Sequence, residues 1–327
     1  MTGTGTVPGA VDLHAHVVLA EAFGTAGTYG PAHGDDDDGV EFFSVGDYTM
    51  KPIPYRGSVF MDVDRRLVEM DRVGIDRQML SPNPLTFFGG VEPGPAIEFA
   101  RATNDAMAAL VARHPARLLG SAQLPMQDPE AAVAELDRAV CELGLVAGYI
   151  GTDYGAPLDD RRFDDFYRRV VELDVPLFVH GVTNDGLGPA PDPRLRRFGL
   201  DLIVGYTYEE TLAAASLVLG GVLDRHPELD VCLSHGGGAI TFLAQRFDSM
   251  AKFRGNESDF AASLGRLWFD SHLEPGAARD LVVGTVGVDR MVYGTNFGGW
   301  DAPTSTDAFD VSLTPNAHRL LRLEATA

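Results

Sequence analysis

Four histidines stand at positions where their imidazole rings could hold a metal ion. His14 and His16 are two residues apart in an apolar stretch, so on a strand their side chains leave the same face. His180 and His235 each end a further apolar run. Neutral imidazoles that converge from several strands suit zinc or a related divalent ion. The spacing therefore predicts a metal site built around these four residues.

The other five histidines fit this pattern less well. His272 also ends an apolar run, with Asp270 on the same face, and is a candidate to line the pocket. Imidazole before a proline at a helix end suits the exposed carbonyl groups and the helix dipole. We therefore interpret the remaining histidines, two before prolines, one in a loop and one on a surface helix, as structural: His114, His226, His33 and His318.

Eight short apolar runs alternate with amphipathic helical patterns along the chain. The expected strands are 11–17, 76–82, 118–125, 145–152, 176–181, 230–236, 267–273 and 290–297. The expected helices are 62–73, 96–113, 129–143, 160–173, 209–225, 239–253, 275–286 and 307–320. A doubly wound sheet gives similar alternation, but the count of eight favours a (β/α)8 TIM barrel. Such barrels build their active sites at the C-terminal ends of the strands, where the four histidines fall.

One segment breaks this rhythm. Residues 19–57 are rich in Gly and Pro and carry the acidic run 35–38, so we expect an irregular insertion after the first strand. Consecutive carboxylates usually lie in solvent, which favours a solvated loop over a second metal site. The whole chain, 1–327, is then one domain, because α/β barrels of this size commonly form a single unit.

Composition limits the classes of partner. A formal net charge of −21 opposes binding to nucleic acid and to anionic membranes. The chain has neither a basic, apolar leader nor an apolar run long enough to span a bilayer, so we expect a soluble, cytoplasmic protein. Its two cysteines, Cys141 and Cys232, are expected to be reduced. Net charge does not exclude a small anionic substrate, because nearby side chains set the field inside a pocket.

Five segments carry a resemblance to a known family. In chain order they are DLHAH (12–16), LPMQ (124–127), LFVH (177–180), SHGGG (234–238) and YGTN (293–296). With them the chain resembles the amidohydrolase-related decarboxylases typified by aminocarboxymuconate semialdehyde decarboxylase. The segments span nearly the whole chain, so the resemblance supports the barrel assignment strongly.

The resemblance implies roles for individual residues. It implies metal ligands at His14, His16 and His180, with Zn²⁺ as the expected ion and Mn²⁺ as an alternative, and it makes His235 the catalytic acid or base. The family's fourth ligand is an aspartate, but this chain has Asn296 there. An amide oxygen can coordinate a metal ion, but it brings no negative charge. The site is therefore weakened, altered from an active parent, or used differently.

Two arginines follow from the same resemblance. Arg246 falls where the resembling decarboxylases carry an arginine that enters the neighbouring subunit's active site, which implies a homodimer. Arg56 lies one residue from the position of a second carboxylate-binding arginine, and a surface ion pair is the alternative for it. After His180 the decarboxylases continue with Pro and Trp, whereas this chain has Gly181 and Val182, so we expect a reshaped pocket.

These observations predict a metal-dependent decarboxylase, a carbon–carbon lyase acting on an aromatic, enol or muconate-like carboxylic acid. His235 would move the proton, and an arginine would hold a carboxylate. The alternative is a hydrolase or hydratase that uses the same metal to activate water against an amide, lactone or double bond. Asn296 counts against that chemistry, for which a carboxylate is expected. A third class is a non-catalytic binding protein that kept the barrel.

Overall fold

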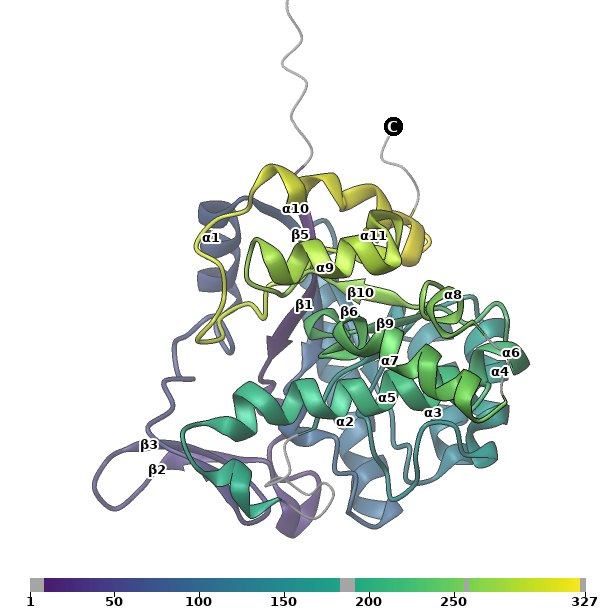
Figure 1. Ribbon diagram of the computed structural model, residues 1–327. Coiled ribbons are helices and arrows are strands. Elements are labelled where there is room, and N and C mark those ends of the chain that lie inside the picture. Colours follow the sequence, from purple (N-terminus) through teal and green to yellow (C-terminus); the bar gives the residue numbers. More distant parts are fainter. Residues whose placement is uncertain (1–8, 183–191, 256–258, 324–327) are drawn as a thin grey trace, which may run out of the picture.

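One parallel sheet of eight strands forms the centre of the molecule (Figure 1). The computed structural model describes residues 9–182, 192–255 and 259–323. In sheet order the strands are β1 (Ala10–Val17), β5 (Ile75–Pro82), β6 (Leu118–Gln123), β7 (Ala147–Ile150), β8 (Leu177–Val179), β9 (Val231–Leu233), β10 (Trp268–Asp270) and β11 (Met291–Val292). Sheet order follows chain order, so every connection between them is a crossover to the next strand.

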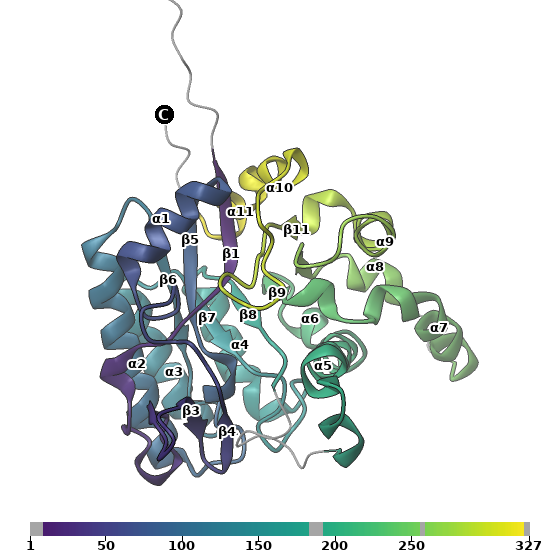
Figure 2. The same cartoon turned by 90° about the vertical axis from the view of Figure 1, so that its left-hand side faces the viewer.

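Hydrogen bonds bring the last strand back to the first. The amide of Leu13 donates to the carbonyl of Tyr293 at 2.9 Å, and the amide of Phe297 donates to that of His14 at 3.4 Å. The sheet is thus a nearly closed barrel with helices around it (Figure 2). The predicted (β/α)8 barrel is confirmed. Most expected strands are longer than the observed ones. Several of them included residues such as His180 and His235, which follow the hydrogen-bonded strands.

The helices agree with the amphipathic patterns in most places. They are α1 (Val63–Val73), α2 (Pro93–Arg113), α3 (Pro129–Cys141), α4 (Asp164–Glu172), α5 (Tyr206–Leu219), α6 (Val222–Arg225), α7 (Ile240–Phe253), α8 (Phe260–Leu264), α9 (Ala277–Val286), α10 (Ala308–Ser312) and α11 (Thr314–Leu320). The helix expected at 209–225 is two helices, since Gly221 takes a left-handed conformation with φ of 70°. Within the described residues, no helix has the length and apolar character needed to cross a membrane.

The insertion after β1 differs from the expectation. It was predicted to be irregular, but it contains an antiparallel sheet of β2 (Ala32–Asp35), β3 (Glu41–Val45) and β4 (Tyr48–Met50). The acidic run ends β2 with Asp35 and continues into the hairpin turn between β2 and β3. There Asp36 accepts bonds from the amides of Asp38 and Val40 and pairs with Lys51 at 2.9 Å. These strands are too short for their alternation to be clear beside so many turn residues.

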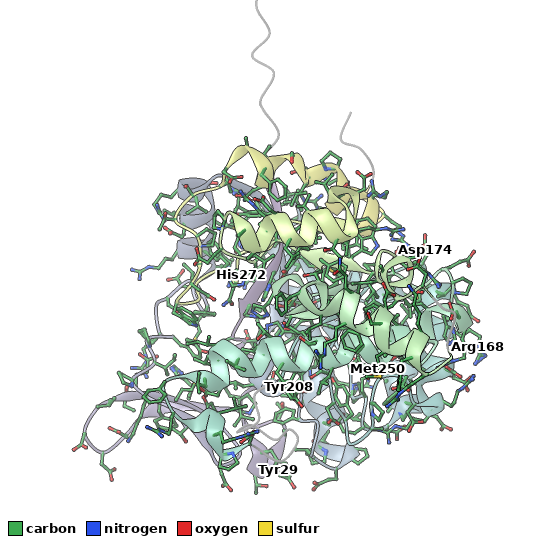
Figure 3. All side chains as sticks on the ribbon, viewed as in Figure 1. Tyr29, Arg168, Asp174, Tyr208, Met250 and His272 are labelled. Carbon is green, nitrogen blue, oxygen red and sulfur yellow. The ribbon has the colours of Figure 1, made fainter. Side chains whose placement is uncertain are left out.

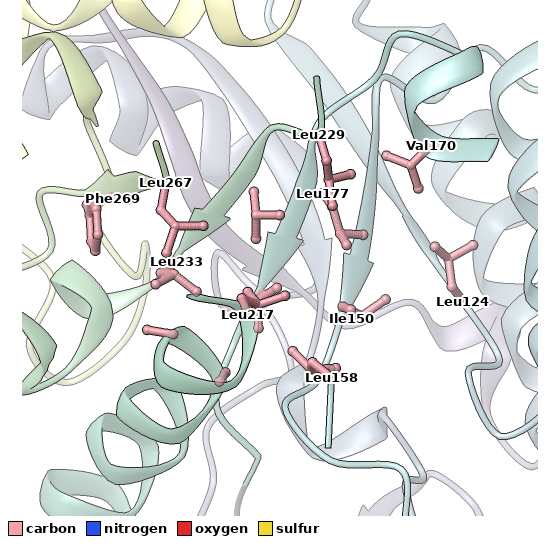
Figure 4. Packing of buried hydrophobic residues seen from close by; sticks show 14 of the residues in the cluster. Leu124, Ile150, Leu158, Val170, Leu177, Leu217, Leu229, Leu233, Leu267 and Phe269 are labelled. Carbon is pink, nitrogen blue, oxygen red and sulfur yellow. The ribbon is translucent and has the colours of Figure 1, made fainter. Parts of the chain in front are cut away.

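Side-chain alternation along the strands separates two buried layers. Leu177 and Phe269 belong to the large cluster between the strands and the helices, part of which Figure 4 shows. Phe178 and Trp268, one position away, belong to a second cluster. Strand residues alternate between faces, so side chains two positions beyond Phe178 and Trp268 also turn to the side of the second cluster. One of these is His180, so the packing that forms the core also orients the site.

Candidate metal centre

Five histidine rings meet at the C-terminal ends of the barrel strands. His14 and His16 lie on β1, and His180, His235 and His272 follow β8, β9 and β10. From the ring centre of His14, the other four lie at 5.0 Å, 5.2 Å, 5.0 Å and 5.4 Å, in the order His16, His180, His235 and His272. The structure therefore brings together the four predicted histidines and His272. Figure 3 labels His272, which lies beside β1 in that view.

Three of these rings form a fully buried set. One ring nitrogen each from His14, His16 and His180 lies within 4.8 Å of the other two. The Nε2 atoms of His14 and His16 are only 3.2 Å apart. Their Nδ1 atoms are held from outside, by Asp270 Oδ2 at 2.6 Å and Ser81 Oγ at 3.0 Å. His180 Nδ1 lies 2.7 Å from the carbonyl oxygen of Gly181.

These partners decide which nitrogen carries the proton. The Asp270 carboxylate and the Gly181 carbonyl can only accept, so Nδ1 of His14 and of His180 must donate. The Ser81 hydroxyl donates to the carbonyl of Ala15 at 3.4 Å, so its oxygen accepts from Nδ1 of His16. In the neutral rings Nε2 is then left with its lone pair. Outer hydrogen bonds of this kind orient metal-binding imidazoles in proteins. The donor set fits a divalent ion, which His14, His16 and His180 would hold through Nε2.

Burial keeps the three rings neutral. It is the main cause that lowers the pKa of His16 to about 3, and it lowers the pKa values of His14 and His180 well below the usual range. The charges of the neighbouring histidines lower them further. A neutral imidazole is the form that binds a metal ion, so the site needs no deprotonation step near neutral pH.

The backbone after β9 presents His235 in an unusual conformation. His235 has a φ of 48°, and the three glycines that follow it are also left-handed. At Gly238 a Cβ atom would lie 2.0 Å from the carbonyl oxygen of Thr207, so only glycine fits. The ring of Tyr206 stacks on His235 at 5.9 Å with an angle of 14° between the planes. The glycine run thus turns the chain sharply and directs the His235 ring to the other histidines.

A buried carboxylate distinguishes His235 from the ligand set. Nδ1 of His235 lies 2.7 Å from Oε1 of Glu210 on α5, and this oxygen also accepts from the amide of Gly181 at 3.1 Å. Burial lowers the pKa of His235, but the charge and hydrogen bond of Glu210 outweigh it and raise the pKa to about 9. Among these rings His235 is therefore the one equipped to carry a proton.

Asp270 ties three parts of the cluster together. Its Oδ2 holds His14, while its Oδ1 accepts from the amide of Gly236 at 2.9 Å and from that of His272 at 3.2 Å. It is almost fully buried, so these bonds take the place of its hydration. Asp270 thus links the ligand strand β1 to the turns that carry His235 and His272.

Asn296 follows β11 in a left-handed conformation with φ of 48°. Its side-chain Nδ2 donates to Oδ1 of Asp301 at 2.8 Å, and Oδ2 of Asp301 lies 3.5 Å from Nε2 of His272. The segment before it packs against the cluster, since a Cβ atom at Gly294 would lie 2.9 Å from Cβ of His14. Asn296 therefore lies beside the histidines, and its role as a ligand stays a prediction.

The two arginines have different surroundings. Arg56 lies in a turn after β4, is exposed, and forms an ion pair at 3.2 Å with Asp35 at the end of β2. This is the surface ion pair given above as its alternative, and its substrate role stays a prediction. Arg246 on α7 is exposed and forms no ion pair with another residue that the structure describes. Its side chain is free to meet a group from outside the chain.

Three residues of the site were not among the candidates from the sequence. Glu210 lies inside a helical pattern rich in alanine, where an acidic residue suggests a solvated face. Asp301 lies in a turn, and Ser81 is the last residue but one of the expected strand 76–82. The position of Ser81 at a strand end was the one available signal. The partners of the other two depend on contacts between distant segments.

A family model described as amidohydrolase matches residues 11–320, which is almost the whole chain. This chain belongs to the amidohydrolase family. This amidohydrolase is 31% identical over 243 residues to 2-amino-3-carboxymuconate-6-semialdehyde decarboxylase of Dictyostelium discoideum, covering 72% of this chain and 66% of that protein. It is 34% identical over 218 residues to gamma-resorcylate decarboxylase of Rhizobium radiobacter, covering 63% and 64%. The match spans just under two thirds of the length of each relative.

Solved structures agree with the amidohydrolase barrel. A 2,6-dihydroxybenzoate decarboxylase in complex with 2,6-dihydroxybenzoate superimposes with a TM-score of 0.76 at 26% identity, over 97% of this chain and 99% of that one. A dihydroxybenzoic acid decarboxylase from Polaromonas sp. JS666, with bound manganese and 2-nitroresorcinol, has a TM-score of 0.74 at 24% identity, over 97% and 98%. The latter likeness concerns the fold alone.

Proposed function

We propose that this amidohydrolase is a metal-dependent decarboxylase of an aromatic, enol or muconate-like carboxylic acid. One observation carries the proposal: three neutral imidazoles turn Nε2 inward, and beside them His235 is held by a buried carboxylate. A divalent ion at the three nitrogens would supply a Lewis acid that stabilises negative charge on a substrate oxygen. His235 would supply the proton that decarboxylation requires.

The proton balance gives His235 a defined task. When the carbon–carbon bond breaks, carbon dioxide leaves and the electron pair stays on the substrate carbon, which must then gain a proton. A protonated His235 can donate from Nε2, because Nδ1 is engaged by Glu210. Glu210 acts as a positioning residue that fixes the ring and stabilises its charged form. His235 is then protonated again from solvent before the next turnover.

The relatives suggest the substrate class. Both curated relatives are decarboxylases of unsaturated or aromatic acids by name, and the structural neighbour holds 2,6-dihydroxybenzoate. Tyr206 and Tyr149 lie next to His180, with ring centres at 5.1 Å and 6.2 Å, and offer flat surfaces for a planar substrate. His272 borders the cluster as a further contact. We propose Zn²⁺ or Mn²⁺ as the ion. A cytoplasmic location stays a prediction.

A direct assay tests the proposal. Purified protein is stripped of metal, reloaded with Zn²⁺ or Mn²⁺, and given 2,6-dihydroxybenzoate and a panel of related acids. We expect one carbon dioxide per substrate consumed by the loaded protein, and loss of turnover after chelation. Substrate loss without carbon dioxide would support the hydrolase or hydratase alternative. Tight binding of an acid without turnover or metal would support the non-catalytic class.

We further propose a homodimer in which Arg246 enters the partner's site. Helix α7 exposes an apolar face around this residue: Phe242, Met250 and Phe253 are 75%, 49% and 86% exposed. At spacings of four, four and three residues, these side chains and Arg246 lie on one face of the helix. Tyr208 on α5, which packs against α7, is 51% exposed, and Figure 3 labels it with Met250. Such a patch is typical of a protein interface.

Mixed dimers test the role of Arg246. The variants His235→Ala and Arg246→Ala are each expected to be inactive alone. If Arg246 acts across the interface, a mixed dimer has one intact site, and random mixing should restore about a quarter of wild-type activity. Exchange is verified by a mass tag on one variant. Confirmed mixed dimers without any gain in activity would show that Arg246 does not act in trans.

A further inference from the structure

A turn brings a carboxylate to the side chain that replaces the family's aspartate. The amide of Gly299 donates to the carbonyl of Asn296 at 2.7 Å, and the chain then folds back so that Asp301 meets the Asn296 side chain. Nothing in the family resemblance concerns Asp301. Its place beside Asn296 depends on the conformation of this turn in this chain.

Asp301 connects two members of the site. One oxygen accepts from Asn296 Nδ2 at 2.8 Å, and the other lies 3.5 Å from Nε2 of His272. The His272 ring is 5.4 Å from that of His14 and 5.2 Å from that of His235. The Asp301 side chain is 23% exposed, so its charge is only partly screened by water. The Asp301 carboxylate therefore lies next to both Asn296 and His272.

The contact also decides how the Asn296 amide is turned. An ionised carboxylate can only accept hydrogen bonds, so the NH2 group of Asn296 must face Asp301. The amide oxygen then points away from Asp301. No hydrogen bond to this oxygen occurs among the described residues, so it is free to act as a ligand or acceptor. Amide oxygens are accepted ligands of divalent cations.

We propose that Asp301 is a positioning residue of the metal centre, which turns the Asn296 oxygen toward the ion and supplies from behind it the charge that a carboxylate at position 296 would carry. This inference rests on the proposed function, because it requires a divalent ion at the histidines. The pair Asn296 and Asp301 then does together what one aspartate does in the resembling family. The substitution at position 296 is on this view compensated within the chain.

Four proteins test the proposal: wild type, Asp301→Asn, Asn296→Asp, and the exchange Asn296→Asp/Asp301→Asn. Their affinity for Mn²⁺ is measured by titration. We expect Asp301→Asn to weaken binding about 10- to 100-fold, the usual range for an outer partner of a metal ligand. Asn296→Asp alone places two carboxylates in contact, which repel each other. Adding Asp301→Asn to it removes this repulsion and should strengthen binding.

Asp301→Asn is thus expected to weaken Mn²⁺ binding in the wild type and to strengthen it in Asn296→Asp. A general structural role of Asp301 would not produce opposite effects in these two proteins. The absorption spectrum of the Co²⁺-loaded protein gives a second readout, and it should change in Asp301→Asn and return toward the wild type in the exchange. Asp280→Asn, at an exposed position on α9, removes the same charge elsewhere and should change neither measurement. Thermal unfolding checks that all variants fold.

The outcomes separate the two proposals. If wild type binds Mn²⁺ through the histidines, but Asp301→Asn leaves affinity and spectrum unchanged, the role of Asp301 is refuted while the proposed function stands. If Asp301→Asn weakens binding equally in both backgrounds, the charge compensation is refuted. If wild type binds no divalent ion, both the proposed function and this inference fail.

Discussion

Replacing His14 and His16 together with alanine is expected to abolish tight binding of a divalent ion and, with it, turnover. The two Nε2 atoms lie 3.2 Å apart on one strand, so the double variant removes two of three nitrogens at once. His180 alone cannot hold the ion tightly, because stable zinc sites use three or four protein ligands. Elemental analysis after dialysis gives the metal content per chain.

A half-buried histidine outside the cluster provides the matched control. His318→Ala on α11 removes an imidazole without any contact to the cluster and should leave metal content unchanged. Circular dichroism and thermal unfolding show whether the double variant keeps the barrel. Metal content equal to that of wild type in a folded double variant would contradict the assigned ligands.

Replacing His235 with alanine is expected to lower kcat by about 10²- to 10⁴-fold, the usual contribution of a general acid or base. Metal content should stay near that of wild type, because the three ligand nitrogens remain. Steady-state kinetics on an accepted acid, together with elemental analysis of the same sample, measures both effects. Full activity in a metal-loaded His235→Ala protein would exclude this residue as the proton donor.

The variant Glu210→Gln separates positioning from proton donation. Glu210 raises the pKa of His235, so removing its charge lowers this pKa. In Glu210→Gln, His235 therefore loses its proton at a lower pH than in the wild type. If His235 donates the proton, the alkaline limb of the pH profile of kcat moves to lower pH in Glu210→Gln. At acidic pH, where His235 is still protonated, kcat should fall less relative to the wild type. A profile that keeps its shape would argue against coupling between the two residues.

The fold was predictable because each strand is a short apolar run between helical patterns. His180 and His235 could be found for the same reason: each ends such a run, and parallel strands of a barrel present their ends at one face. The family resemblance added roles to these positions. The resemblance could not predict the contact between Asn296 and Asp301, because matching motifs identify single positions and not the contacts between side chains.

Glu210 shows what the sequence could not reveal. It lies 25 residues before His235 in the chain. Its carboxylate reaches the ring because α5 packs against the segments that follow β8 and β9. Its local pattern is that of an ordinary helix residue. Arg56 pairs with Asp35 on the surface, and the sequence did not indicate Asp35 as its partner. Both outcomes depend on tertiary contacts that no local pattern specifies.

The seam between the first and last strands has a consequence for the order of synthesis. β1 carries His14 and His16 and is synthesised well before its partners across the seam, which lie at Tyr293 and Phe297. Buried Asp12 likewise lacks a hydrogen-bond donor until Thr295 is synthesised, whose hydroxyl donates to it at 2.7 Å. Until those residues emerge, one edge of β1 is unpaired and the active site has an open side. Premature release of the chain before this point therefore leaves a fragment with an exposed strand edge and no complete site.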